Sequence, residues 1–253
     1  MNLTDLYNII LFPWILIGAI TFIVLMFVTA PYGRFSKHNW GPMISSKNGW
    51  IIQESVSPII FAFFFISGPA IKSTAMWIFF IIWVGHYFNR SFIYPFRQGK
   101  SADMPITIMF SAVFFNIING FINGYYLGNL SANKYQEIEY LQQPNFIIGI
   151  IIFLIGLFVN QKSDTILLKL KKENKGYQIP QGFLYNYISC PNYLGEILEW
   201  VGYAIMTACL PGFIFACWTI FNLLPRALDH HKWYKNKFSN YPKNRKVIIP
   251  FIL

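Results

Sequence analysis

Long stretches without a charged side chain are the feature that most limits how this chain can fold. Five such stretches lie between Asp5 and Arg34, Glu54 and Lys72, Lys72 and Arg90, Asp103 and Lys134, and Glu139 and Lys162. Each can hold a helix of about 17 to 25 residues, the length that the hydrocarbon core of a bilayer requires. The sequence therefore predicts five membrane-spanning helices in these stretches.

The composition agrees with a polytopic membrane protein. Of the 253 residues, 55% are hydrophobic and only 12% are charged, whereas soluble domains have about 25% charged residues. A further apolar stretch runs from Trp200 to Pro225 and contains Leu210-Pro211-Gly212. It holds either one long helix or the second part of a hairpin that is broken at this point.

The distribution of Lys and Arg decides between these two alternatives. With the N-terminus outside, the outside loops hold only Lys72 and Lys134, whereas the inside loops hold Arg34, Lys37, Lys47, Arg90, Arg97, Lys100, Lys162, Lys169, Lys171, Lys172 and Lys175. A hairpin at Pro211-Gly212 also places the basic C-terminal tail inside, so that eighteen of the 20 Lys and Arg residues are cytoplasmic. Such a bias is the positive-inside signal.

We therefore predict an all-α polytopic membrane protein with seven transmembrane helices, the N-terminus outside and the C-terminus cytoplasmic. The chain shows no internal repeat and no soluble segment, so residues 1–253 are expected to form a single transmembrane domain. The N-terminal apolar segment has no Lys or Arg before it and is too long for the core of a signal peptide. It is expected to be retained as a span.

The cysteines and the net charge narrow the classes of partner. Cys190, Cys209 and Cys217 have no CxxC or Cys/His spacing and lie in or near apolar helices, where Cys commonly serves as a small hydrophobe. We expect no disulfide and no metal. The net charge of +10 is spread along cytoplasmic loops beside lipid, which favours anionic headgroups and an anionic cofactor over nucleic acid. No obligate protein partner is evident.

Polar side chains collect at the cytoplasmic ends of the predicted helices, and their spacing places each set on one helix face. The sets are Asn192, Glu196 and Glu199; Arg226, His230 and Tyr234; Asn160 and Asp164; and Tyr87, Arg90 and Tyr94. Gln53 and Glu54 begin another helix at the same level. Ionisable groups inside a membrane are costly, and they commonly mark a functional site.

Each set also has an ordinary explanation. The stripe that begins at Arg226 could face headgroups, Glu196 and Glu199 could pair for packing, and Glu54 could favour a helix dipole. The convergence of five helix ends instead favours a polar pocket that opens to the cytoplasm. Its outer Arg, Lys and Asn side chains suit phosphates and ribose hydroxyls, and its apolar inner part suits a flat, lipid-soluble substrate. The chain has no GxGxxG motif after a strand, so a Rossmann fold is not expected.

Several segments carry a resemblance to a known family. They are HYFNRSFIYPF (86–96), NQKSD (160–164), IPQGFLYNYISCPNYLGEILEWVGYA (179–204), RALDHHKWY (226–234) and FSNYPKNRKVIIPFIL (238–253). They resemble the steroid 5α-reductase (3-oxo-5α-steroid 4-dehydrogenase) family of NADPH-dependent membrane enzymes, here as a bacterial-type homologue. The resemblance runs from about Ala30 to Leu253, and its last seventy-five or so residues are the most specific.

The resemblance implies a seven-helix enzyme that reduces the C4–C5 double bond of a 3-oxo-Δ4 steroid, or of a similar flat enone, with NADPH bound from the cytoplasmic side. Glu54 and Tyr87 match the pair that hydrogen-bonds the C3 ketone. The positions that match the cofactor site are Asn160, Asp164, Lys171, Tyr177, Asn192, Glu196, Arg226, His230 and Tyr234, with Arg97 and Lys100 from the preceding loop. Residues from about 145 to 253 form most of this site.

The sequence departs from the pattern of the family at three points. Lys171 replaces an arginine of relatives, which keeps the charge but loses the bidentate fork. Asp229 stands where relatives have a histidine and is not carried over. The loop after Tyr94 is one residue shorter than in some relatives, which affects the alignment of Arg97 and Lys100.

We expect a multi-pass protein of a bacterial inner membrane or an endoplasmic reticulum membrane, in contact with lipid and with its active site open to the cytoplasm.

Three other classes stay open at this stage. Trans-2-enoyl-CoA reductases share the PNY and YP…IPF segments, but GEILEW and the Gln53-Glu54 pair favour the steroid branch. Isoprenylcysteine methyltransferases carry an Arg…Glu-Glu pattern where this chain has Arg226 followed by Asp229-His230-His231. A non-enzymatic sterol-binding or channel protein has no need of a nucleotide-like polar mouth.

Overall fold

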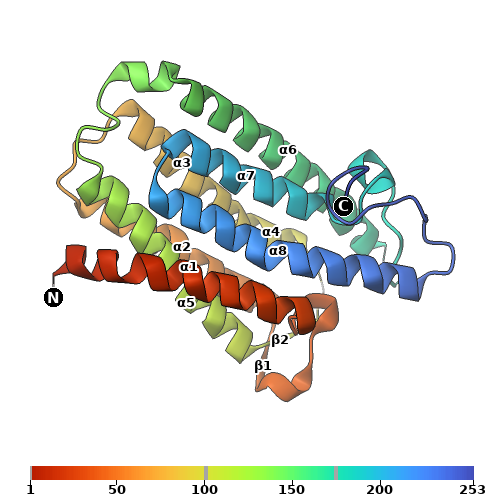
Figure 1. Ribbon diagram of the computed structural model, residues 1–253. Coiled ribbons are helices and arrows are strands. Elements are labelled where there is room, and N and C mark those ends of the chain that lie inside the picture. Colours follow the sequence, from red (N-terminus) through yellow and green to blue (C-terminus); the bar gives the residue numbers. More distant parts are fainter. Residues whose placement is uncertain (1, 100–101, 174–175) are drawn as a thin grey trace. The chain divides into compact units, whose positions relative to one another are not determined.

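The computed structural model describes residues 2–99, 102–173 and 176–253, and these are mostly helical (Figure 1). The helices are α1 (Leu3–Phe27), α2 (Ser46–Ser67), α3 (Thr74–Phe88), the four-residue α4 (Tyr94–Arg97), α5 (Ile106–Tyr125), α6 (Pro144–Lys172), α7 (Pro191–Thr207) and α8 (Leu210–Lys237). The two-residue strands β1 (Met43–Ile44) and β2 (Met104–Pro105) pair antiparallel. The predicted all-α class is confirmed.

Short irregular helices join these elements. Two π-helices, Asn89–Ile93 and Tyr126–Leu130, extend the C-terminal ends of α3 and α5, respectively. The 3₁₀ segments are Gly33–Phe35, His38–Trp40, Ile138–Gln142 and Phe183–Asn186.

Five helices of the described residues are long and apolar enough to cross a membrane. They are α1, α2, α5 with its π-helical end, α6 and α8. The helices α3 and α7 have 15 and 17 residues and are shorter. Each charge-free stretch identified in the sequence contains a helix, but α3, in the stretch from Lys72 to Arg90, is shorter than the predicted span. Seven crossings and the orientation of the termini stay predictions.

The stretch from Trp200 to Pro225 is broken, as the distribution of basic residues predicted. α7 ends at Thr207, Ala208 adopts a left-handed conformation with φ of 46°, and α8 begins at Leu210. The break lies slightly before Pro211-Gly212. Pro211 stands in the first turn of α8, where a backbone N–H has no helical partner in any case.

The internal contacts divide the chain into two compact units. The first unit comprises Met1–Pro13 and Ala30–Ile147, and the second comprises Trp14–Thr29 and Ile148–Leu253. α1 therefore contributes its beginning to one unit and its remainder to the other. The expected single domain over residues 1–253 stays a prediction.

In the first unit, α2 and α5 touch through their backbones. A Cβ atom added at Gly124 of α5 would lie 2.5 Å from the carbonyl oxygen of Phe61, and one added at Gly120 would lie 2.9 Å from that of Ser57. Glycines four residues apart are the usual means of close helix contact in membranes, because lipid provides no hydrophobic force between helices. The contact fixes the register of α5 on α2.

In the second unit, glycines spaced seven residues apart on both partners bring α6 and α7 together. A Cβ atom at Gly156 of α6 would lie 2.6 Å from the carbonyl oxygen of Gly195 of α7, and one at Gly149 would lie 2.7 Å from that of Gly202. Seven residues are close to two helical turns, so the glycines of each helix share one face. These two helices are therefore also in direct backbone contact.

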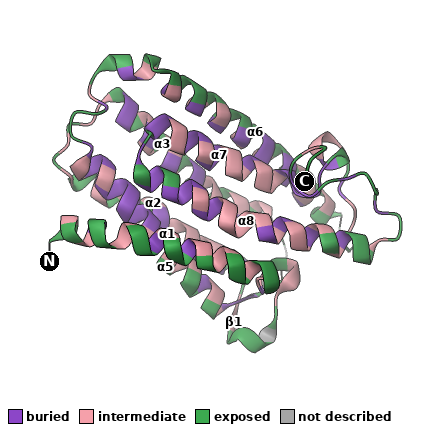
Figure 2. Ribbon diagram, in the orientation of Figure 1, coloured by how far each residue is buried: buried purple, intermediate pink, exposed green. Residues whose placement is uncertain are grey.

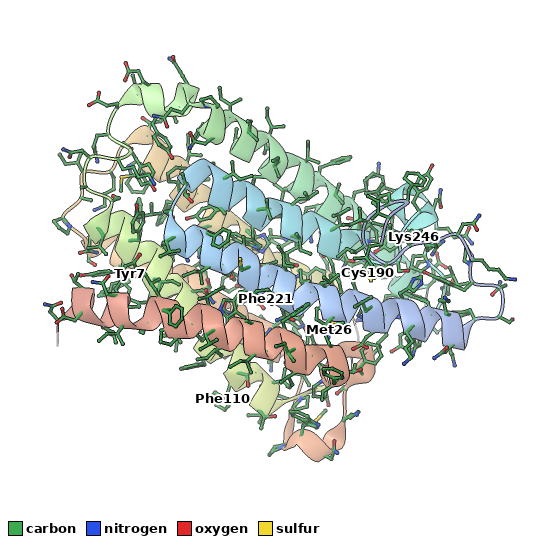
Figure 3. The ribbon with its side chains drawn as sticks, in the orientation of Figure 1. Tyr7, Met26, Phe110, Cys190, Phe221 and Lys246 are labelled. Atoms are coloured by element: carbon green, nitrogen blue, oxygen red, sulfur yellow. The ribbon has the colours of Figure 1, made fainter. Side chains whose placement is uncertain are left out.

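The side chains of α8 pack on the part of α1 that belongs to the second unit. The indole N–H of Trp218 donates to the carbonyl oxygen of Trp14 at 3.1 Å, and the ring of Phe221 lies 5.5 Å from that of Phe22. Many large apolar side chains on the outer faces of the helices are exposed, among them Phe110 of α5 (Figures 2 and 3). An apolar exterior is what contact with lipid requires.

The glycine contacts make a stability prediction. Gly124→Ala and Gly156→Ala are each expected to lower the stability of the detergent-solubilised protein by about 1 to 3 kcal/mol, because the added methyl group has no room and the helices must separate. Thermal unfolding of the purified variants measures this.

Gly85→Ala is the matched control, because among the described residues no atom outside the glycine's own stretch of helix lies within 4 Å of a Cβ atom at that position. It should leave the stability equal or raise it slightly, since Ala favours a helix over Gly. Equal unfolding temperatures for all three variants would show that the close contacts do not limit packing.

Candidate functional site

In the first unit, a hydrogen-bonded chain joins Glu54 to Tyr87. The side-chain amide of Gln53 donates to Oε1 of Glu54 at 2.9 Å, and Nδ2 of Asn116 donates to the backbone oxygen of Gln53 at 2.7 Å. The hydroxyl of Tyr87 donates to Oδ1 of Asn116 at 3.4 Å. Three helices, α2, α3 and α5, therefore contribute to one polar group.

This polar group is largely shielded from solvent, and Tyr87 is the last ring in a row of packed aromatic side chains. Gln53, Tyr87 and Asn116 are 7%, 4% and 3% exposed, and Glu54 is half-buried. The ring of Trp83 stacks on Phe61 at 4.8 Å and lies 5.6 Å from the ring of Tyr87. The Tyr87 hydroxyl is thus a polar group next to an apolar surface formed by the rings of Phe61 and Trp83.

The π-helix Asn89–Ile93 and α4, which follow α3, are held against the start of α2. The guanidinium of Arg90 lies 4.5 Å from the centre of the Trp50 ring, and Nζ of Lys47 lies 3.7 Å from that of Phe96. π-Helical turns are frequent at functional sites. Arg97, half-buried at the end of α4, closes this segment.

In the second unit, an amide relay joins α6 to α7. Nδ2 of Asn160 donates to the backbone oxygen of Asn192 at 3.0 Å, and Nδ2 of Asn192 donates to Oδ1 of Asp164 at 3.1 Å. The backbone contact of Gly156 with Gly195 lies one turn away on the same two helices. The three predicted residues therefore meet because the helices touch.

A tyrosine joins α7 to α8 in the same unit. Nε of Arg226 donates to the hydroxyl of Tyr193 at 2.8 Å, and this hydroxyl lies 3.1 Å from Nε2 of His230. The ring of Tyr234, one turn further along α8, stacks on Tyr241 with 5.5 Å between centres. All three residues of the predicted α8 stripe therefore face groups from other segments.

The C-terminal segment is fastened to the start of α7 through Ser189. Its hydroxyl lies 2.6 Å from Nδ1 of His231 and 2.6 Å from the hydroxyl of Tyr241, and it donates to the backbone oxygen of Lys246 at 3.1 Å. Figure 3 labels the neighbouring Cys190 and Lys246. These bonds hold Tyr241 against Tyr234.

A buried phenol lies beside the amide relay. Tyr185 donates to the backbone oxygen of Ser163 at 3.4 Å. Burial, and then the nearby charge of Asp164, raises the pKa of Tyr185 well above its ordinary value. The phenol therefore stays neutral and can donate a hydrogen bond throughout the physiological range.

The structure brings most of the predicted residues into these groups but not all of them. Glu196 lies half-buried on α7 beside the relay residues. Lys171 is exposed near the end of α6, and Tyr177 is exposed with its ring against Trp233. Lys100 lies outside the described residues. The binding roles of all predicted residues stay predictions.

Sequence reasoning missed four residues of these networks: Asn116, Tyr193, Ser189 and Tyr241. Asn116 escaped because it is uncharged and lies in a charge-free stretch. A signal was present, since Asn116, Asn119 and Asn123 repeat at the spacing of one helix face within an apolar segment. Tyr193 directly follows Asn192 and was read only as part of a motif.

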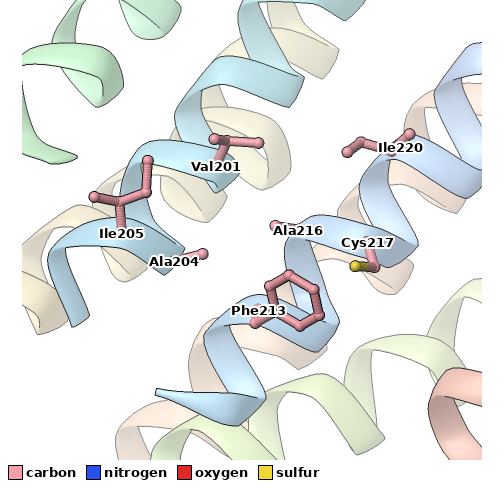
Figure 4. A pocket seen from close by; sticks show the side chains of 7 residues that line it. All are labelled: Val201, Ala204, Ile205, Phe213, Ala216, Cys217 and Ile220. Atoms are coloured by element: carbon pink, nitrogen blue, oxygen red, sulfur yellow. The ribbon is translucent and has the colours of Figure 1, made fainter. Parts of the chain in front are cut away.

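An apolar cavity of about 240 Å³ lies between the later part of α7 and the start of α8 (Figure 4). Its lining residues are Val201, Ala204, Ile205, Phe213, Ala216, Cys217 and Ile220. Because this lining presents no strong hydrogen-bonding side chain, it does not suit the polar ligand that the stripes predict.

Comparison with known proteins gives a consistent result for the whole chain. Residues 102–253 match the family model described as 3-oxo-5-alpha-steroid 4-dehydrogenase. The chain is 38% identical to steroid 5-alpha-reductase DET2 of Gossypium hirsutum, over 98% of this chain and 97% of that relative. It is 35% identical to 3-oxo-5-alpha-steroid 4-dehydrogenase 1 of Bos taurus, over 94% of this chain and 93% of the relative, and equally identical to the Homo sapiens protein of that name, over 87% and 85%.

Proposed function

The chain belongs to the 3-oxo-5-alpha-steroid 4-dehydrogenase family of steroid 5-alpha-reductases, and on that basis we propose that it reduces the C4–C5 double bond of 3-oxo-Δ4 steroids with NADPH. It is an oxidoreductase that acts on CH–CH bonds, and its several apolar helices make it a multi-pass membrane protein. The observation that carries the proposal is the buried network that joins Tyr87 to Glu54.

The proposed chemistry needs a hydrogen-bond donor at one atom of the substrate. A hydride that reaches C5 of the enone pushes negative charge onto the C3 oxygen, so a donor placed at that oxygen stabilises the transition state. The Tyr87 hydroxyl is such a donor, with Glu54 beside it as an orienting acceptor or, when neutral, as a second donor. C4 must also take up a proton, which we assign to solvent.

The second unit supplies residues that fit NADPH. The hydride belongs to the bound cofactor, and the protein contributes position and electrostatics. Arg226 suits a phosphate, Asn160 and Asn192 present amides, and Asp164 suits ribose hydroxyls. On the same face of α6, the Ser163 hydroxyl is buried without a hydrogen-bond partner among the described residues, which supports a polar ligand here.

The proposed cofactor site includes further residues of the chain. It takes in His230 and Tyr234 from α8, Glu196 from α7, and Lys171 and Tyr177 after the relay. Arg97 and Lys100 belong to it by the family resemblance. Residues from about 145 to 253 would thus hold most of the cofactor.

We further propose seven membrane crossings with the N-terminus outside, and with the C-terminus and the active site on the cytoplasmic side of a bacterial inner membrane or an endoplasmic reticulum membrane. The basic residues support this topology, because the loops that it places outside hold only Lys72 and Lys134. α3 continues through the π-helix Asn89–Ile93 into α4, which lengthens it, and the 17 residues of α7 are at the lower end of the length that can span a bilayer.

The topology predicts which side chains an impermeant thiol reagent reaches in intact cells. Asn133→Cys, in an exposed loop placed outside, should be labelled, and Lys237→Cys, exposed at the end of α8, should be labelled only after the cells are opened. The unmodified chain provides the background signal. Labelling of Lys237→Cys in intact cells would reverse the proposed orientation.

The reaction and its ketone pair are tested together. Purified protein with NADPH and a 3-oxo-Δ4 steroid should consume NADPH and form the 5α-reduced 3-oxosteroid. Glu54→Gln and Tyr87→Phe should each lower turnover by about 10² to 10³, the usual effect of losing one donor at a developing oxyanion, whereas NADPH still binds. Product formation and the fall in NADPH absorbance measure the turnover of each variant.

Tyr125→Phe is the matched control for this experiment. Tyr125 is a buried tyrosine of the same unit that bonds to Thr4 rather than to the Tyr87 network, so its activity should stay close to that of the unmodified protein. Full activity of both Glu54→Gln and Tyr87→Phe would remove the ketone assignment. Turnover of an enoyl-CoA or methylation of a prenylcysteine instead of steroid reduction would reject the proposed function.

The cofactor residues predict a different phenotype. Arg226→Ala and Asn192→Ala should raise the dissociation constant of NADPH by about tenfold or more, since a charge-assisted or amide hydrogen bond is worth roughly 1 to 3 kcal/mol. Fluorescence titration of NADPH measures this without turnover. Lys237→Ala, which removes an exposed cation from the same helix as Arg226, is the control. Unchanged dissociation constants in both variants would remove these residues from the site.

A further inference from the structure

Asn116 holds a position that the proposed reaction does not explain by itself. It is a neutral amide in the middle of an apolar helix, and it is only 3% exposed. It touches the two segments that carry the proposed ketone pair, since it bonds to Gln53 of α2 and to Tyr87 of α3. A buried amide costs free energy unless both of its ends are bonded.

The bond to Gln53 fixes which way the amide points. A backbone carbonyl can only accept a hydrogen bond, so the end of Asn116 that lies 2.7 Å from the Gln53 oxygen is its NH₂ group. The carbonyl end, Oδ1, therefore faces the Tyr87 hydroxyl and accepts from it. Asn116 thus offers the Tyr87 hydroxyl an acceptor in a fixed direction.

The bond between Tyr87 and Asn116 is long enough to be exchanged for another. Its length of 3.4 Å lies at the upper limit for a hydroxyl donor, beyond the usual 2.5 to 3.0 Å. A ketone oxygen that arrives near the hydroxyl offers a second acceptor at little cost. Asn116 therefore orients the phenol without retaining its proton.

The same contact also sets Tyr87 relative to Glu54. The main chain of Gln53 receives the Asn116 bond, and the side chain of Gln53 donates to Glu54 at 2.9 Å. One amide on α5 therefore links a residue of α3 with a residue of α2. The close α2–α5 contact at Gly120 and Gly124 keeps this link short.

We propose that Asn116 is the positioning residue of the ketone pair, which holds the Tyr87 hydroxyl in register with Glu54 for the reduction of the enone. This inference rests on the proposed function. It predicts that Asn116 acts on the rate through Tyr87 and makes little contribution to the binding of either reactant.

Another asparagine of α5 shows that burial alone does not produce this arrangement. Asn123 is 1% exposed, and its Nδ2 donates to the backbone oxygen of Asn119, four residues earlier in the same helix. The bonds of Asn116 instead cross to two other helices. Asn123 therefore serves as a matched control for the loss of a buried amide.

A double-mutant cycle tests the proposal in the full-length protein. Asn116→Leu should lower kcat for a 3-oxo-Δ4 steroid by about tenfold, since a misplaced donor costs rate rather than affinity, and it should leave the steroid KM and the NADPH dissociation constant within about twofold. The double variant with Asn116→Leu and Tyr87→Phe should react at a rate within about twofold of that of Tyr87→Phe alone. Single-turnover kinetics measure both rates.

Two further variants keep the test decisive. Asn123→Leu should retain the kcat of the unmodified protein. Asn116→Asp should be active at low pH, where the neutral carboxyl group can donate to Gln53 and accept from Tyr87. Its activity should fall as the pH rises through the pKa of the new carboxyl group, because the carboxylate cannot donate. The unmodified protein should not lose activity over the same pH range.

The outcomes separate this inference from the proposed function. Absence of steroid reduction by the unmodified protein, or full activity of both Glu54→Gln and Tyr87→Phe, contradicts the proposed function. If these behave as expected, two results overturn the inference. One is that Asn116→Leu slows the unmodified protein and the Tyr87→Phe variant by the same factor. The other is that Asn123→Leu slows turnover as much as Asn116→Leu does. If Asn116→Leu does not fold, the pH profile of Asn116→Asp decides, and a profile like that of the unmodified protein overturns the inference.

Discussion

Direct contact between helix backbones is the constraint on which the rest of this structure depends. Within the first unit α5 lies on α2 through Gly120 and Gly124, and within the second unit α6 lies on α7 through glycines that repeat every seven residues. Lipid supplies no hydrophobic force that would press helices together, so such contacts are made by close packing and by polar bonds. They also fix register. A shift of α7 by one turn along α6 would separate Asn160 from Asn192, which now meet one turn from the touching glycines.

Close contact is what allows short polar side chains to bond across helices. Asparagine reaches only a few ångströms, yet Asn116 reaches α2 and α3, and Asn160 reaches α7. An unsatisfied polar group in an apolar interior costs several kcal/mol, so these amides favour one arrangement of their helices over neighbouring ones. A tyrosine makes the corresponding link between α7 and α8, where the Tyr193 hydroxyl accepts from Arg226 and lies 3.1 Å from Nε2 of His230. Packing and polarity therefore specify the same register in each unit.

The sequence predicted the features that depend on charge and missed those that depend on neutral contacts. Charge-free stretches located the long helices, and the distribution of basic residues predicted a break at Pro211-Gly212, which the structure has slightly earlier, between Thr207 and Leu210. Helical spacing correctly placed Asn160 with Asp164, and Arg226 with His230, on shared faces. Asn116 and Tyr193 were missed because an uncharged side chain leaves no mark in a count of charges, and because their partners lie on helices that only the glycine contacts bring near. The exposure of Lys171 and Tyr177 likewise depends on how the chain leaves α6, which local sequence does not determine.

The division of α1 has a consequence for anyone who dissects this protein. Its residues up to Pro13 belong to the first unit, and Trp14–Thr29 belong to the second. Pro13 lacks the N–H that would bond to Ile9, so the helix is weakest at this boundary. A cut in the connection before α6 would leave Trp14–Thr29, including the Trp14 that binds Trp218, on the wrong fragment. One cleavage therefore cannot release either unit complete. In a split version of this enzyme, α1 of the first fragment would have to pack on the second fragment before the two pieces could reassemble.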